Sequence, residues 1–460
     1  MVAKILEGNK VHFTSLGCAR NLVDSEVMLG ILLKAGYEPA QTLEEADFLI
    51  VNTCGFLAES RKESCDTIDL LLKEKKEGAK VVVAGCMVQK YGPEIKERFP
   101  AVHYFLGSGD MEKILEAVQT PESGVAVTSA RSYLESGEIP RQISTPKHYA
   151  YLKIAEGCMK RCAFCIIPNI KGPLRSKSQD QVLKEFHTLL NQGVFEVILI
   201  AQDLGDYGKD RKEVDGLTTL LRSMLEVKKD FWLRLLYLYP DEITEEILQL
   251  LESDKRICRY LDMPIQHINP RILKAMRRKT SKDQILTTIG ELRKRLPDMM
   301  IRTSLMVGFP GETDEEFEEL VQFVKDVPLD NIGIFKYSRE EESHSAKLPD
   351  HISEEVKQKR FERLVKTQMA QVRKRNKAHI GKKLPVIVEG YHPESNLLMR
   401  GRFYGQCPEI DGQVIINDGR KVTAFGKLYE VEITDVADYD LIGTVVAPLR
   451  KRESLCLVSS

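Results

Sequence analysis

The chain has 460 residues, a length that predicts two to four domains, each able to bury a core of its own. Its 67 Lys and Arg nearly balance its 68 Asp and Glu, so the overall charge indicates neither a nucleic-acid nor a membrane partner. No apolar run approaches the roughly 20 residues that span a bilayer, and the first residues lack the apolar core of a signal peptide. Ten scattered cysteines do not form a secreted disulfide framework, so we expect a soluble cytoplasmic protein with metal-binding thiols.

Residues 10–120 alternate short β-branched runs with helical patterns, which predicts an open parallel α/β sheet. The strand-like runs are VHFTS at 11–15, DFLIV at 47–51, KVVVA at 80–84 and VHYFL at 102–106. In such sheets ligands gather outside the carboxyl ends of the strands. The residues that directly follow these runs are therefore candidates for a site.

Three cysteines follow these runs in matching positions, each beside a glycine. Cys18 stands in SLGCARN, Cys54 in NTCGF and Cys86 in AGCM. We expect all three to reach the same edge of the sheet, where their thiolates could hold an iron-sulfur cluster. The alternative for any one of them is a small apolar residue that suits a strand end.

Residues 121–147 are rich in Pro, Ser and Gly and lose hydrophobic periodicity, which predicts a linker. Residues 148–377 again alternate strand-like and helical patterns, and we interpret them as one domain. Its six strand-like runs fit the β/α units of a partial (β/α)6 barrel of TIM type. The runs are YAYLKIA, FEVILIAQD, FWLRLLYLY, RYLDMP, MIRTSLMVG and NIGIFKY.

The loop after the first of these strands reads EGCMKRCAFCIIP and carries Cys158, Cys162 and Cys165. Three thiolates spaced as CxxxCxxC can converge on one metal centre but are one ligand short of a closed tetrahedral site. Soft thiolate ligands leave two candidates: an iron-sulfur cluster with one uncommitted iron, or a zinc ion with a borrowed fourth ligand. The loop lies at the mouth where such barrels keep their chemistry.

Other strand ends offer candidates for cofactor contacts. Gln202 follows the second barrel strand in AQDLGDYG, and Gly308 and Gly311 follow the fifth in GFPGET. The glycines would let the backbone pass close to a ligand, or they make a tight turn with no ligand. Thr313 and Glu316 then predict a capping box at the start of the next helix.

A long charged helix is expected over 353–379, followed by short alternating strands at 378–446 that predict a small antiparallel β-barrel. Residues 447–460 are expected to form a tail. Between 378 and 444 the sequence has seven Lys or Arg and ten Asp or Glu. An acidic barrel is poorly suited to phosphates, which argues against direct RNA binding and favours a basic protein partner.

The cysteine loop resembles the radical S-adenosylmethionine (SAM) superfamily, whose motif CxxxCxΦC has an aromatic residue at Φ, here Phe164. The resemblance implies a 4Fe-4S cluster on Cys158, Cys162 and Cys165, with SAM on the fourth iron. It also implies that reduction by an electron donor cleaves SAM to a deoxyadenosyl radical.

The order of the three parts resembles the methylthiotransferase family. That resemblance implies a second 4Fe-4S cluster on Cys18, Cys54 and Cys86, a central radical SAM barrel and a C-terminal TRAM barrel that binds the substrate. The phrases SLGCARNLVDSE, VNTCGF, YLDMPIQH, VGFPGET and PEIDGQV look like the members that add a methylthio group to the β-carbon of an aspartate in small-subunit ribosomal protein twelve. Ala19 and Arg20 depart from the usual Pro-Lys of the first phrase, and QDLGDYG departs from the usual QDTSAYG.

Two alternative functions stay open at this point. The first is a tRNA adenosine methylthiotransferase with the same domains, and the second is an iron-sulfur redox protein without catalysis. The remaining cysteines have no second thiol at ligand spacing, so we do not expect them to bind a cluster; they are Cys65, Cys258, Cys407 and Cys456.

Overall fold

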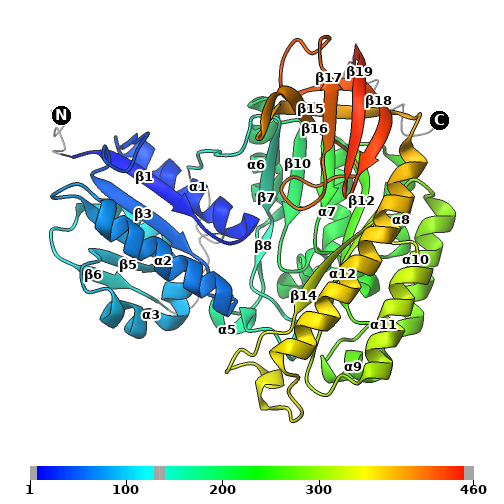
Figure 1. Cartoon of the computed structure of the whole chain (residues 1–460). Helices are drawn as coiled ribbons and strands as arrows, with labels where there is room; N and C mark the ends of the chain where they lie inside the picture. Colours follow the sequence, from blue (N-terminus) through cyan, green and yellow to red (C-terminus); the bar gives the residue numbers. More distant parts are fainter. Residues whose placement is uncertain (1–7, 129–133, 135–139, 450–460) are drawn as a thin grey trace.

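The structure is a computed structural model, and it describes residues 8–128, 134 and 140–449. Cys456 and most of the expected tail lie outside these residues. The described chain forms three large sheets and one two-stranded ladder. The large sheets are an N-terminal open sheet, a central open barrel and a small closed barrel at the upper end of the molecule (Figure 1). None of the helices in the described residues combines the length and apolar character that a bilayer crossing needs.

The N-terminal sheet is parallel throughout, with the strand order β2-β1-β3-β4-β5-β6. The four expected strands are confirmed, and the short strands β2 and β6 extend the two edges. β6 lies inside the segment expected to be linker. The strands are β1 (Lys10–Ser15), β2 (Glu38–Pro39), β3 (Phe48–Thr53), β4 (Lys80–Gly85), β5 (Tyr104–Gly107) and β6 (Gly124–Ala126).

Helices cover both faces of this sheet, because the inner strands β3, β4 and β5 are buried on both sides. One apolar cluster includes Val11 and Ile50, and a second on the other face includes Leu49 and Val81. The helices are α1 (Ala19–Lys34), α2 (Ala58–Glu74), α3 (Cys86–Arg98) and α4 (Ile114–Gln119).

The central sheet confirms the six expected barrel strands, all parallel, in the order β14-β13-β12-β11-β10-β7. β7 and β14 do not pair with each other, so the barrel is open along one side. The strands are β7 (Tyr149–Lys153), β10 (Glu196–Ile200), β11 (Trp232–Leu235), β12 (Ile257–Gln266), β13 (Met300–Val307) and β14 (Asn331–Lys336). A two-stranded ladder, β8 (Ala155–Glu156) with β9 (Arg175–Ser176), encloses the cysteine loop.

The helices around this barrel begin at strong local signals. Capping boxes pair Ser178 with Gln181, Ser281 with Gln284 and, as expected, Thr313 with Glu316. The helices are α5 (Ile167–Lys171), α6 (Gln179–Asn191), α7 (Gly216–Leu225), α8 (Glu245–Ser253), α9 (Pro270–Ala275), α10 (Lys282–Arg295), α11 (Asp314–Asp326) and α12 (Glu354–Asn376).

The C-terminal barrel is closed, with the order β15-β16-β17-β19-β18. Neighbouring strands pair antiparallel as expected, except that β17 and β19 pair in parallel and complete the closure. The strands are β15 (Lys383–His392), β16 (Ser395–Phe403), β17 (Val414–Asp418), β18 (Lys427–Ala437) and β19 (Asp440–Pro448).

This barrel closes the end of the central barrel where the strands begin. Tyr260 of β12 donates a hydrogen bond to Asp411 at 2.7 Å, and Arg402 of β16 pairs with Glu196 of β10 at 2.9 Å. Trp232 and Phe403 belong to one buried apolar cluster that spans the junction. The opposite end, where the strands finish, therefore remains available for a site.

Candidate functional site

The first group of cysteines gathers at one edge of the N-terminal sheet, as expected. β1, β3 and β4 are neighbours in the sheet, and Cys18, Cys54 and Cys86 each follow one of them. Cys18 precedes the first residue of α1, and Cys86 is the first residue of α3. We refer to these three residues as the N-terminal triad.

Glycines allow the backbone segments of this triad to approach one another. Gly17 has a φ of 89°, and a Cβ placed on it would lie 2.9 Å from Cβ of Cys54. Gly85 has a φ of 107°, and a Cβ there would lie 2.5 Å from the carbonyl oxygen of Thr53. No other residue fits these two positions without displacing the cysteine loops.

Arg20 changes the electrostatic surroundings of this triad. Burial would raise the pKa of Cys18, but the Arg20 guanidinium and the backbone N–H groups of Asn21 and Arg20 outweigh it, so this pKa lies below that of an ordinary thiol. Burial raises the pKa of Cys86 to about 12 and also raises that of Cys54. Cys18 is thus the thiol best prepared to act as a thiolate ligand.

The second group, the loop triad, consists of Cys158, Cys162 and Cys165 in the turn between β8 and α5. Backbone N–H groups of Lys160 and Ile167 each lie 3.4 Å from a sulfur, that of Cys158 and that of Cys165. Sulfurs that accept backbone hydrogen bonds are typical of cluster ligands, because these bonds stabilise the thiolate. The turn also needs Gly157, since a Cβ there would lie 2.0 Å from the carbonyl oxygen of Pro173.

Buried charges hold the loop in place. Lys160 lies 3.2 Å from Asp203, 3.4 Å from Asp206 and 2.6 Å from Glu242. Burial and the neighbouring carboxylates raise the pKa of Asp203 to about 7, although Lys160 opposes the change. Arg278 completes the support with a contact of 3.5 Å to the sulfur of Cys162.

Ligand spacing distinguishes a single metal ion from a cluster. Three thiolates on one zinc ion, each about 2.3 Å from the metal, would lie about 3.8 Å apart. Among the described residues, the only trio of His, Cys, Asp or Glu with all ligand atoms within 4.8 Å of one another is Asp203, Asp206 and Glu242. Lys160 already pairs with all three of these side chains. Both cysteine triads are more open, so they suit a multi-iron cluster better than one zinc ion.

The two triads meet where the N-terminal sheet contacts the barrel. Cys86 packs against Ile166 and Ile170, which directly follow the loop triad. Arg20 donates a hydrogen bond to the carbonyl oxygen of Ala201 at 2.7 Å, and its guanidinium lies 4.9 Å from the ring centre of Tyr237. Arg20 also influences the Cys165 thiol electrostatically. One cation from the first domain therefore lies between both sets of thiols.

A buried ion network fixes this contact. Asp24 of α1 binds Lys153 of β7 and, at 3.2 Å, Lys171 of α5. Lys171 also pairs with Glu156 at 2.6 Å. All four side chains are almost completely buried, and the two positive and two negative charges balance.

The expected SAM contacts occupy the same end of the barrel. Gln202 follows β10 beside Ala201, and its buried side-chain oxygen has no hydrogen-bond partner among the described residues, so it could accept a hydrogen bond from a ligand. Phe164 packs on the apolar cluster that contains Phe309. Gly308 and Gly311 both have positive φ, but a Cβ on Gly308 would meet Lys357 at 2.4 Å, so the close approach there is to α12.

Sequence reasoning did not assign roles to Arg20, Asp24, Lys153, Glu156 or Lys171. Most of their contacts join segments that are more than a hundred residues distant in the sequence. The exceptions are the contacts of Glu156 with Lys153 and with Lys171. The only local signal is the position of Arg20 in the helical turn that follows Cys18. The remaining described cysteines, Cys65, Cys258 and Cys407, are buried in apolar clusters.

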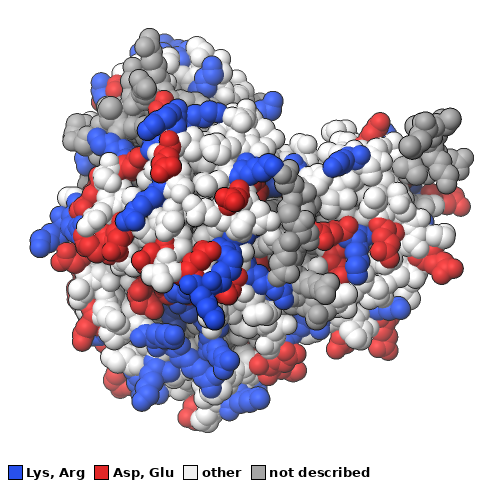
Figure 2. All heavy atoms as spheres, turned by 180° about the vertical axis from the view of Figure 1, so that it is seen from behind, with Lys and Arg blue, Asp and Glu red and all other residues white. Residues whose placement is uncertain are grey.

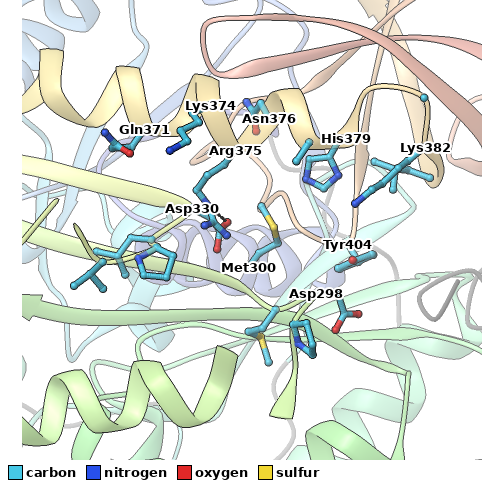
Figure 3. A pocket seen from close by; sticks show the side chains of 18 of the residues that line it. Asp298, Met300, Asp330, Gln371, Lys374, Arg375, Asn376, His379, Lys382 and Tyr404 are labelled. Atoms are coloured by element: carbon cyan, nitrogen blue, oxygen red, sulfur yellow. Dashed lines mark hydrogen bonds and ion pairs between the residues drawn. The ribbon is translucent and has the colours of Figure 1, made fainter. Parts of the chain in front are cut away.

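A pocket of about 770 Å³ lies away from both cysteine triads, at the end of the barrel where β13 and β14 begin (Figure 3). α12 and the C-terminal barrel form its other walls. Lys374, Arg375, His379 and Lys382 line it from one side, and Asp330 pairs with Arg375 at 2.6 Å. Because this pocket is at the other end of the barrel, we do not include it in the site formed by the two cysteine triads.

Three family models match the chain in succession. They are the Uncharacterized protein family UPF0004 at residues 10–107, the Radical SAM superfamily at 152–324 and the TRAM domain at 380–446. Among solved structures, the radical S-adenosylmethionine methyltransferase TsrM from Kitasatospora setae aligns with a TM-score of 0.53 at 16% identity, over 72% of this chain and 76% of that chain. This likeness shows a shared fold.

The open parallel barrel, its cysteine loop and the matching family model define a radical SAM enzyme. The chain is 65% identical to the ribosomal protein uS12 methylthiotransferase RimO of Protochlamydia amoebophila, over 96% of this chain and 93% of the relative. Identity is 58% with RimO of Chlamydia caviae and 44% with RimO of Bdellovibrio bacteriovorus, over 95% and 97% of this chain and 95% and 99% of those proteins. The chain belongs to this family of methylthiotransferases.

Proposed function

We propose that the chain adds a methylthio group to the β-carbon of an aspartate in ribosomal protein uS12. The observation that carries the proposal is the meeting of two cysteine triads across one domain contact, with Arg20 between them. The names of the relatives favour this substrate over a tRNA adenosine. A redox protein without catalysis would not require a second set of open thiols beside the first.

Each triad would hold one 4Fe-4S cluster with one iron free: Cys18, Cys54 and Cys86 in the N-terminal domain, and Cys158, Cys162 and Cys165 in the barrel. Phe164, Gln202 and the loop at Gly308 and Gly311 would contact SAM. When bound, the cofactors supply the reductive cleavage of SAM, the radical that removes a hydrogen atom, and the methylated sulfur. Acid-base side chains cannot break an unactivated C–H bond, which is why the cofactors carry this step.

The protein's own residues bind, orient and exclude water. Arg20 presents a fixed positive charge to Cys18 and ties the N-terminal domain to the end of β10. The buried network of Asp24, Lys153, Glu156 and Lys171 keeps the two triads at a constant separation. Because these four side chains are buried, they exclude water from the domain contact beside the triads, which would help to protect a reactive radical.

We assign residues 10–120 to the cluster-bearing domain, 148–377 to the radical SAM domain and 378–446 to the barrel that receives uS12, with residues 121–147 as linker. The enzyme would act in the cytoplasm with a protein that donates electrons, and without direct contact to RNA.

Anaerobic reconstitution followed by assays of iron, sulfide, deoxyadenosine and modified uS12 tests the proposal. Replacing any loop-triad cysteine with Ala should remove about four irons and abolish deoxyadenosine formation. Replacing any cysteine of the N-terminal triad should remove about four irons, leave deoxyadenosine formation possible and abolish methylthio transfer. Normal product from an N-terminal variant would disprove the assignment of two clusters, and Cys65→Ser is the matched control with unchanged iron.

A further inference from the structure

The outer face of the loop triad forms a basic surface at the end of the barrel. A pocket of about 410 Å³ opens there, between the cysteine loop and the turn that follows α9. Its rim includes Met159, whose surface is 54% exposed although the side chain is apolar. The cations that line the pocket are Lys160, Arg161, Arg277, Arg278 and Lys279.

Three of these cations have no carboxylate partner. Arg161, Arg277 and Lys279 are exposed and form no ion pair within the described residues. Asp241 is the single acidic residue that lines the pocket, and it accepts a hydrogen bond from Thr280 at 2.8 Å. We call Met159, Arg161, Arg277 and Lys279 the loop-face patch; its uncompensated charge gives a positive local potential in a chain that is nearly neutral overall.

The loop-face patch is separated from a cluster ligand by one side chain. Arg278 contacts the sulfur of Cys162 at 3.5 Å and stacks on Tyr239, with 4.2 Å between the guanidinium carbon and the ring centre. Cys162 itself is partly exposed. On the other side of the loop, Cys86, Ile166 and Ile170 pack together in a buried cluster.

On the back face of the molecule, positive and negative side chains are mostly mixed. Figure 2 shows Lys and Arg interspersed with Asp and Glu over most of the back face, with a group of Lys and Arg at the lower end of the larger lobe. The same end of that lobe carries α9 in Figure 1. The loop-face patch belongs to the cysteine loop and to the turn after α9, so it lies at the end of the barrel where the loop triad is, opposite the C-terminal barrel.

We propose that the loop-face patch docks a small acidic protein that carries single electrons and reduces the cluster on the loop triad. The inference rests on the proposed function, because each reductive cleavage of SAM consumes one electron: the carrier is oxidised by one electron and the cluster is reduced by one. Complementary charge speeds such encounters and selects the partner. Exposed Met159 supplies an apolar contact at the rim of the docking surface.

The test compares two reductants on the reconstituted enzyme. The variant Arg277→Glu/Lys279→Glu reverses two charges of the patch without altering the cysteine loop. With a reduced acidic flavodoxin at low salt, we expect its deoxyadenosine formation to fall at least about tenfold, because like charges now oppose docking. With excess dithionite, which needs no protein interface, the rate should equal that of the wild type.

Binding provides a readout independent of catalysis. The wild type should bind oxidised flavodoxin in titration calorimetry, more weakly as salt rises, and the double variant should bind about tenfold more weakly. Lys374→Glu/Lys382→Glu, which reverses two cations at the far end of the barrel, is the matched control and should behave as the wild type. Equal flavodoxin affinity and equal flavodoxin-driven rates in wild type and patch variant would overturn the docking surface. A wild type that forms no deoxyadenosine even with dithionite would instead contradict the proposed function.

Discussion

Arg20 holds a permanent positive charge between thiols that come from two different domains. Its hydrogen bond to Ala201 and its position over Tyr237 fix the guanidinium, so the charge cannot move away from Cys18. An arginine suits this position, because its planar fork can donate in several directions and stack on an aromatic ring at once. One side chain therefore favours thiolate ligands and also positions the domain that carries them.

His379, in the wall of the pocket of Figure 3, gives a prediction about pH. Burial and the nearby cations Lys382 and Arg375 lower its pKa to about 4, although Asp330 opposes them. The unfolded chain binds this proton near pH 6.5 and the folded chain only near pH 4, so stability is complete above pH 6.5 and is lost as the pH falls toward 4.

Between pH 7 and pH 5, this histidine should account for about 2 kcal/mol of the loss in free energy of unfolding. His379→Gln should remove that part of the pH dependence, measured by urea unfolding with the fluorescence of Trp232, the single tryptophan. His344→Gln, at an exposed histidine, serves as control. An unchanged pH dependence in His379→Gln would show that this imidazole has the same pKa in the folded and unfolded chains.

At the residue scale, the sequence allowed us to predict those site residues that short local motifs mark. Six cysteines stood out because their spacing and the glycines beside them are visible in short phrases, and the structure brings them together in two groups of three. Arg20 and Lys171 could not be assigned, because the partners that give them a role lie in another domain. An isolated charged residue has no sequence signature that separates a buried ion pair from a solvated surface.

At the level of elements, repeated local signals made most strands and helices predictable. Continuous apolar runs marked the buried parallel strands, and Thr313 with Glu316 marked the start of α11. β2, β6 and the parallel pairing of β17 with β19 were not predicted. β2 and β6 have only two and three residues, and the direction of pairing depends on how the barrel closes, so no run of sequence encodes them.

The C-terminal barrel gives a prediction about substrate binding through strand β18. Glu432 and Asp435 are exposed on this strand, whereas Glu430 is largely covered and pairs with Lys383 at 3.2 Å. Glu432→Lys/Asp435→Lys in the full chain should weaken binding of basic uS12 about tenfold at low salt, because attraction becomes repulsion. Fluorescence anisotropy of labelled uS12 measures the affinity.

Deoxyadenosine formation in that variant should stay at the wild-type level, since β18 lies at the opposite end of the molecule from the loop triad (Figure 1). Asp283→Lys/Glu291→Lys on α10 is a matched charge reversal away from the barrel. Equal loss of uS12 affinity in both double variants would mean that overall charge, and not the face of β18, attracts the substrate.

For the whole molecule, the contact between the N-terminal domain and the barrel depends on Asp24. Asp24→Asn would remove the carboxylate that Lys153 and Lys171 share, and an uncompensated buried charge costs about 3–5 kcal/mol. We expect faster amide hydrogen exchange in α1, measured by mass spectrometry, together with loss of methylthio transfer. Asp24→Asn/Lys171→Met restores the charge balance and should recover part of the protection. Wild-type exchange in Asp24→Asn would exclude this network as the anchor.

The two triads also differ in the length of chain that separates their members, with consequences for biogenesis. The loop triad lies within eight residues, Cys158 to Cys165, so a nascent or partly folded chain can already present all three thiols to iron. The N-terminal triad exists only after three parallel strands have found their register, and such long-range pairing is slow. Maturation should therefore be ordered, with iron entering the barrel first. When iron supply is interrupted, a half-matured enzyme that cleaves SAM without product should accumulate.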